Sequence, residues 1–124
     1  MDDELLYEYI SKELANFKFT RSSISYIYLI EAIKIVSKNK MVIKDFNKLV
    51  YKVIAKKYNT EEKNVNWSIS KLLKLMYLNT NEEVIKKYFN LVYDDDKITT
   101  KAFIIFIAYK VNFREKKKIM EKFY

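Results

Sequence analysis

Hydrophobic residues recur every three to four positions along most of the chain, which is the spacing of amphipathic α-helices. The pattern predicts a first helix over about residues 3–16 and a second over about 23–37. The second segment, SISYIYLIEAIKIVS, is apolar nearly all round and is therefore expected at the centre of the domain. Tyr26 and Tyr28 within it are expected to be packing residues.

A helix, a tight turn and another helix are predicted for residues 43–77. The third helix is expected over about 43–57 and the fourth over about 61–77. Between them, Asn59 is the residue best suited, short of Gly, to a left-handed helix end, and Thr60 is expected to cap the fourth helix. This is the layout of a helix-turn-helix, which many DNA-binding proteins use to read a groove.

The periodicity also assigns an inward face to each of these two helices. On the third helix the inward residues are predicted to be Phe46, Leu49, Val50, Val53 and Ile54. On the fourth helix they are predicted to be Val65, Ile69, Leu72, Leu73 and Met76.

Two further helices are predicted beyond the fourth. The residues TNEE at 80–83 fit the pattern of a capping box, with Thr80 as the expected cap and Glu83 three positions later, which predicts a fifth helix ending near Leu91. A sixth helix is expected over about 99–112, where the sequence AFIIFIAYKV is apolar on most sides.

The carboxylates at 94–96 match no EF-hand spacing and predict a solvated loop between these helices. The tail, FREKKKIMEKFY, has the spacing of an additional amphipathic C-terminal helix. Its apolar residues are Phe113, Ile119, Met120 and Phe123. Three roles stay open for this tail: packing on the domain, self-association, or fraying.

Composition agrees with an all-α fold, a compact bundle of about six helices in a single domain over residues 1–124. The chain has 124 residues and contains no Gly, Pro, Cys or His. Without Gly or Pro nothing interrupts helices, and hairpin turns that need positive φ would rely on Asn or Asp. Without Cys or His, disulfides, zinc-thiolate sites and His-assisted nucleophilic catalysis are excluded. We therefore expect no cofactor, no metal site and no enzymatic activity.

The net charge of +8 is unevenly placed along the chain. Residues 1–33 carry three basic and six acidic side chains, whereas residues 34–74 carry eleven lysines against three carboxylates. Residues 75–124 carry ten basic and seven acidic side chains. Charge concentrated in this way usually serves a polyanion, although a solvated lysine-rich surface is the simpler interpretation.

Lysines recur every four residues through the third helix. A step of four advances the angle around an α-helix by only about 40°, so these side chains are expected to form one slanting stripe. Like charges at this spacing repel one another unless an anion offsets them, and the first helix of a helix-turn-helix lies across the phosphate backbone. The candidate phosphate contacts are Lys40, Lys44, Lys48, Lys52, Lys56, Lys57 and Thr60.

The outward face of the fourth helix holds the candidate base-reading residues. These are Lys63, Asn64, Asn66, Trp67, Ser70, Lys71 and Lys74. Asn64 and Asn66 are suited to adenine edges and Lys71 to a guanine or a phosphate. Trp67, near the centre of this face, is suited to thymine methyls or sugars, or else to a protein interface, where Trp is favoured as an anchor. The alternative is that Trp67 has only a structural role and is covered by the C-terminal tail.

Residues 26–60 resemble the C-terminal effector domain of the stage 0 sporulation protein A family of regulators. The resemblance is carried by YIYLIEAIKIV at 26–36, by Lys48 and Tyr51, and by IAKKYNT at 54–60. It continues with Val65 and Ile69 and with TTKAFIIFIAYKV at 99–111. The family fold is a bundle of six helices that holds a helix-turn-helix.

The resemblance implies binding to short duplex sites upstream of promoters, as head-to-tail copies or a homodimer, with contacts to the RNA polymerase sigma factor. Lys48, Lys56 and Lys57 match family residues in or near the helix that faces the DNA backbone. The family's recognition helix reads Arg-Val-Glu-Arg-Ala-Ile-Arg-His, and this chain reads NVNWSISK at 64–71. The apolar frame survives and the arginines are replaced, so the family's target sequence is not expected here.

These features support three hypotheses. The first is a sequence-specific double-stranded DNA-binding protein, a transcriptional regulator with altered specificity that lacks a receiver domain, for which 124 residues leave no room. The second is a protein-interaction module that binds a sigma factor, a full-length relative or itself through the Trp67 face. The third is a plasmid or phage accessory protein for DNA maintenance or transfer. The acidic N-terminus and the absence of a long uncharged apolar run favour a cytoplasmic, nucleoid-associated protein with no membrane contact.

Overall fold

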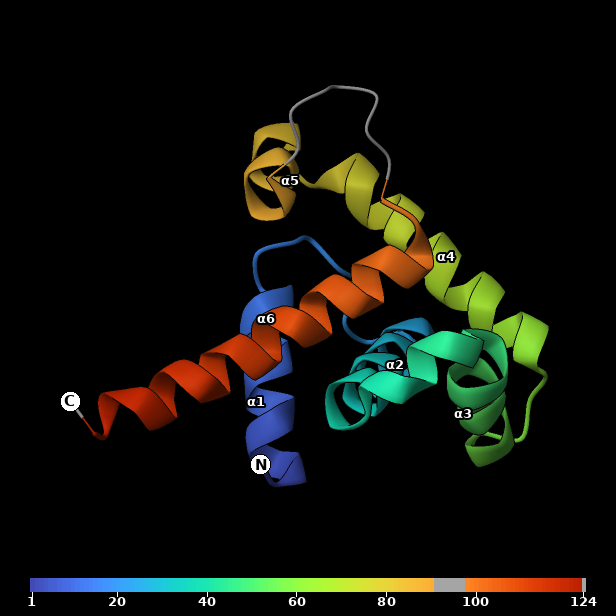
Figure 1. Ribbon diagram of the computed structural model, residues 1–124. Coiled ribbons are helices and arrows are strands. Elements are labelled where there is room, and N and C mark those ends of the chain that lie inside the picture. Colours follow the sequence, from blue (N-terminus) through green and yellow to red (C-terminus); the bar gives the residue numbers. More distant parts are fainter. Residues whose placement is uncertain (91–97, 124) are drawn as a thin grey trace.

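A computed structural model describes residues 1–90 and 98–123, and every regular element within them is a helix (Figure 1). The α-helices are α1 (Asp3–Leu14), α2 (Ile24–Lys38), α3 (Lys52–Lys57), α4 (Glu62–Asn79), α5 (Glu82–Phe89) and α6 (Thr100–Glu121). The expected all-α fold is therefore confirmed. The loop predicted at 94–96 and the predicted end of the fifth helix at Leu91 lie outside the described residues.

Helix α2 occupies the centre of the bundle, as its apolar sequence predicts. It packs against α1, α3, α4 and α6, and Leu29, Ala32 and Ile33 on it have no exposed surface (Figure 1). Tyr26 and Tyr28 are also buried, which confirms their role in packing. Burial raises the pKa of the Tyr26 hydroxyl above its usual value.

The segment predicted as one third helix, 43–57, is not a single α-helix. A 3₁₀ segment, η1 (Lys40–Asp45), is followed by a π-helical segment, η2 (Asn47–Tyr51), and only then by α3. The wider π turn changes the phase of the side chains, because its hydrogen bonds join residues five apart instead of four. Leu49 and Val53, predicted to face inward, are therefore 39% and 49% exposed.

The predicted burial of Phe46, Val50 and Ile54 in this segment is confirmed. Tyr51 and Ala55 fill the positions that the phase change vacates, and both are buried. Burial also raises the pKa of Tyr51 to about 12. The segment thus keeps a continuous apolar side toward α2 and α4 in spite of its irregular backbone.

The turn between α3 and α4 is built on Asn59, as predicted. Its φ of 54° is left-handed. The Thr60 amide donates to the Ala55 carbonyl at 2.9 Å and the Asn59 amide donates to the Lys56 carbonyl at 3.4 Å. These two bonds define a Schellman motif, which satisfies the last carbonyls of α3 and turns the chain sharply.

Two predicted helix caps are wrong. Glu61, not Thr60, precedes α4, and it makes no side-chain cap. Asn81, not Thr80, caps α5 by accepting from the Glu83 amide at 2.8 Å. Thr80 is buried, and its hydroxyl instead accepts from the Lys18 amide at 3.0 Å, which ties the end of α4 to the loop after α1.

Aromatic rings attach α5 to the rest of the bundle. The Phe89 ring lies 4.9 Å from that of Phe106 and 5.6 Å from that of Phe103, both on α6. Phe17, in the loop after α1, lies 4.8 Å from Tyr88 and 5.8 Å from Phe89. Edge-on, tilted and stacked aromatic pairs at these separations are favourable, so this cluster holds a helix of only eight residues in place.

The tail does not form a separate helix, because α6 runs without a break to Glu121 and projects beyond α1 (Figure 1). The four apolar tail residues are all exposed: Phe113, Ile119, Met120 and Phe123. Packing of the tail's apolar side on the domain, one of the three expected roles, is therefore ruled out. Within residues 1–90 and 98–123, no helix is long and apolar enough to span a membrane.

The backbone at Asn59 gives a direct test of the fold. Asn59→Val should lower the free energy of unfolding by about 1–2 kcal/mol, because a β-branched residue is poorly tolerated at positive φ. Asn59→Gly should be close to neutral. Urea denaturation measures both.

Asn66→Val is the matched control, since Asn66 is an exposed residue in the regular part of α4. Asn and Val have similar helix propensities, so this change should cost little. Equal losses for Asn59→Val and Asn66→Val would contradict the role assigned to the turn.

Candidate nucleic-acid interface

The frame of the interface is the packed face of α4. All five residues predicted to face inward are buried: Val65, Ile69, Leu72, Leu73 and Met76. This face packs on α2, α3 and the η2 segment. With this side fixed against the bundle, the opposite side of α4 faces solvent except at Ser70, which is half-buried.

Trp67 lies on that outward side and is 64% exposed. The C-terminal tail therefore does not cover it, and that alternative is wrong. The Lys71 ammonium lies 4.9 Å from the centre of the Trp67 ring, one helical turn further along. This is a cation–π contact, which holds a positive charge and a large apolar surface side by side.

The polar candidates near Trp67 differ in their exposure and in their hydrogen-bond partners within the protein. The side-chain Nδ2 of Asn64 donates to the Thr60 hydroxyl at 3.2 Å, at the edge of the turn. Ser70 is half-buried, and its hydroxyl lies 3.2 Å from the Asn66 side-chain oxygen and 2.9 Å from the Thr100 hydroxyl at the start of α6. Ser70 is thus turned toward α6, whereas Asn64 and Asn66 remain exposed.

Acidic residues surround the start of α4. Glu61 pairs with Lys63 at 3.3 Å, and Glu62 follows in the first turn. These carboxylates oppose phosphate binding at the amino end of the helix, which is otherwise an anion-binding position. The cationic part of the outward face lies further along, at Lys71 and Lys74, both of which are exposed.

All six candidate phosphate-binding lysines are exposed: Lys40, Lys44, Lys48, Lys52, Lys56 and Lys57. The 40° step on which the stripe was predicted requires a regular α-helix, and the 3₁₀ and π segments interrupt it before Lys52. It therefore applies only from Lys52 to Lys56.

Lys57 has an internal partner that the sequence did not reveal. Its ammonium donates to the Glu31 carboxylate of α2 at 2.9 Å, and this hydrogen bond is the main reason why the pKa of Lys57 is raised. Glu31 also pairs with Lys34 at 3.8 Å. A phosphate at Lys57 would have to compete with this carboxylate, so Lys57 is the weakest of the six candidates.

A second feature missed by the sequence interpretation lies toward the end of α4. Leu75 and Leu78 are 46% and 75% exposed. They line an open groove of about 440 Å³ together with Trp67, Ser70, Lys71 and Lys74. The signal was present in the sequence, because both leucines fall outside the inward set of α4, but their joint exposure beside Trp67 required the structure.

Comparison with known proteins identifies the family that this architecture represents. Residues 10–111 match the family described as sporulation initiation factor Spo0A C terminal. The match covers most of the chain and includes every helix from α2 to α5. No curated protein matches the chain.

Proposed function

The chain belongs to the Spo0A C-terminal family of DNA-binding effector domains, and we propose that it is a sequence-specific regulator of transcription with its own DNA target. In this proposal α4 enters the major groove of a duplex. The lysines of η1, η2 and α3 bind the flanking phosphates.

The observation that carries the proposal is the division of α4 into two opposite faces. The frame that seats the helix on the bundle is complete, while the exposed side presents Asn64, Asn66 and Trp67. Amide side chains pair with adenine edges, and the Trp67 ring offers an apolar surface to thymine methyls. This chemistry favours A·T-rich sites over the guanine-containing sites that arginines recognise.

The lysines supply affinity without sequence information. Among them, Lys48, Lys52 and Lys56 are exposed and have no carboxylate within ion-pair distance in the described part of the chain. Each phosphate that such a lysine neutralises releases counterions, which makes binding weaken as salt rises. A charged surface of this kind positions the protein, and the residues of α4 choose the sequence.

The proposal predicts different effects for the two groups of residues. Lys48→Ala should weaken binding to all duplexes similarly and reduce the salt slope by about one unit. Asn64→Ala or Trp67→Ala should change which duplexes are selected from a random pool. Sequencing of the selected duplexes, with fluorescence anisotropy over a series of salt concentrations, measures both effects.

Lys87→Ala on α5 is the matched control for Lys48→Ala, because it removes the same charge from an exposed residue on a helix that lies away from α3, beyond the carboxyl end of α4 (Figure 1). It should leave the salt slope unchanged. No enrichment of any duplex by the unmodified protein would contradict sequence-specific binding.

A second candidate function is supported by the groove beside Trp67. Exposed leucines are unusual on a DNA-reading face, and Trp with neighbouring apolar residues is a frequent anchor of protein interfaces. In this alternative the Trp67 face binds a sigma factor, a full-length relative or a second copy of the chain. Head-to-tail copies on DNA could contact one another through the Trp67 face only if that face does not contact the DNA bases.

Leu78→Glu separates the two functions. Leu78 lies at the far end of α4 from Asn64, so the substitution should leave duplex selection unchanged under the first function. Under the second it should abolish self-association or sigma-factor binding, as followed by light scattering and by Trp67 fluorescence. Loss of duplex binding together with unchanged association would contradict this division.

A further inference from the structure

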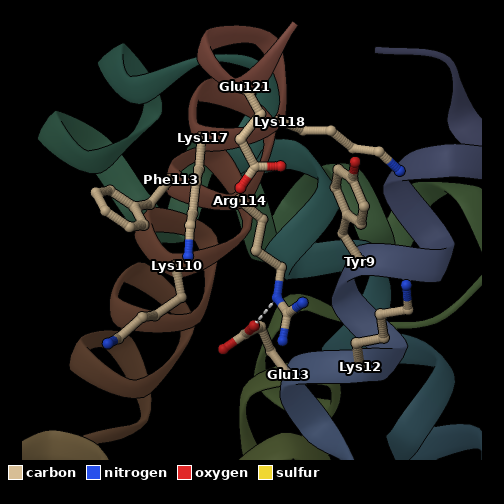
Figure 2. A pocket seen from close by; sticks show the side chains of 9 residues that line it. All are labelled: Tyr9, Lys12, Glu13, Lys110, Phe113, Arg114, Lys117, Lys118 and Glu121. Carbon is tan, nitrogen blue, oxygen red and sulfur yellow. Dashed lines mark hydrogen bonds and ion pairs between the residues drawn. The ribbon is translucent and has the colours of Figure 1, made fainter. Parts of the chain in front are cut away.

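A second concave surface lies between α1 and the carboxyl-terminal half of α6, at the end of the domain away from α3 and α4 (Figures 1 and 2). This α1–α6 groove has a volume of about 440 Å³, within the range of small-molecule sites. The proposed DNA-binding function makes no use of it.

The α1–α6 groove is rich in positive charge. Five cationic side chains line it: Lys12 on α1, and Lys110, Arg114, Lys117 and Lys118 on α6. Only two carboxylates, Glu13 and Glu121, share the groove. A concave site lined mainly by charges of one sign concentrates ions of the opposite sign, so this groove attracts anions.

The tail lysines are the cations most available to a ligand. Lys12 pairs with Glu8 at 3.1 Å, and the Lys110 ammonium lies 5.5 Å and 5.6 Å from the centres of two aromatic rings. Lys117 and Lys118 have no carboxylate within ion-pair distance among residues 1–90 and 98–123. Neither ammonium is therefore held in an ion pair within this part of the chain, although Glu121 shares the groove with them.

Arg114 is fixed in orientation by a buried carboxylate. Its Nε donates to Glu13, which also accepts from the Tyr88 hydroxyl at 2.7 Å (Figure 2). Glu13 is only 5% exposed, so its carboxylate interacts with these two partners and is shielded from solvent. Among the described residues the Nη groups of Arg114 have no hydrogen-bond partner, and a guanidinium held in this way suits the paired oxygens of a phosphate.

The groove also has an aromatic wall. Phe113, which adjoins Arg114 in the sequence, is 55% exposed and borders the groove (Figure 2). An exposed ring beside phosphate-binding cations provides a surface on which a base can stack. Bases in a duplex are already stacked on their neighbours, so this wall favours a nucleotide that is not base-paired.

We propose that the α1–α6 groove binds a nucleoside phosphate, with its phosphates on Arg114 and Lys117 and its base against Phe113 (Figure 2). A free nucleotide and an unpaired nucleotide of a single strand share this chemistry. The site is separate from the face of α4, so the protein can hold a duplex and this ligand together.

Titration calorimetry of the full chain with ATP tests the proposal. ATP should bind with one-to-one stoichiometry, and Lys117→Glu should weaken it about tenfold or more, because a charge-assisted contact is lost. Phe113→Ser should weaken ATP while leaving inorganic triphosphate nearly unchanged. Arg114 is not replaced, since its loss would leave Glu13 buried without its cation.

Lys116→Glu is the matched control, because Lys116 is exposed on the same helix and does not line the groove. It should change the affinity less than about twofold, as expected for a surface charge without direct contact. Circular dichroism checks that each variant is folded. Competition with oligothymidylate identifies the source: displacement of ATP by the oligomer at lower concentration than by free nucleotide assigns the site to single strands, and the reverse assigns it to nucleotides.

Three results would overturn the proposal: no saturable binding of ATP, equal weakening by Lys116→Glu, or triphosphate binding as tightly as ATP with no effect of Phe113→Ser. None of them depends on duplex selection. A protein that selects no duplex can still bind ATP, and the converse also holds, so failure of this proposal is distinguishable from failure of the proposed DNA-binding function.

Discussion

The left-handed backbone at Asn59 is the constraint on which the candidate interface depends. In a chain without Gly, the two described residues with positive φ are both Asn, at 59 and 90. At Asn59 the turn closes through the bond from the Thr60 amide to the Ala55 carbonyl, which sets the direction in which α4 leaves α3. Once that direction is set, burial of Val65 and Ile69 leaves Trp67 on the opposite side of the helix, in solvent.

Much of the fold could be predicted from the sequence wherever the helix is regular. The inward face of α4 was predicted residue by residue, because 18 consecutive residues keep the period of an α-helix. The same reasoning failed for Leu49 and Val53, since the π turn of η2 adds a residue to the turn and moves both into solvent. A local change of helix type has no clear signature in a pattern of apolar positions.

Caps and side-chain partners could be predicted least well, because they depend on contacts between segments distant in sequence. Thr80 matched a capping box, but its hydroxyl bonds to Lys18, 62 residues away. Likewise, the sequence placed Lys57 on a phosphate-binding stripe without revealing Glu31, its partner on α2. The sequence thus predicts the candidate site as a set of exposed residues. The competition of Glu31 for Lys57 and the exposure of the leucines beside Trp67 can be seen only in the three-dimensional structure.

The central claim is that the outward face of α4 contacts the duplex, and Trp67 reports on it directly because it is the only tryptophan in the chain. The measurement is Trp67 fluorescence during titration with a selected duplex, with binding followed independently on labelled DNA. We expect emission to change in parallel with binding, to saturate with it, and to lose this response as salt rises. Full binding of the duplex with no change in Trp67 emission would contradict the account.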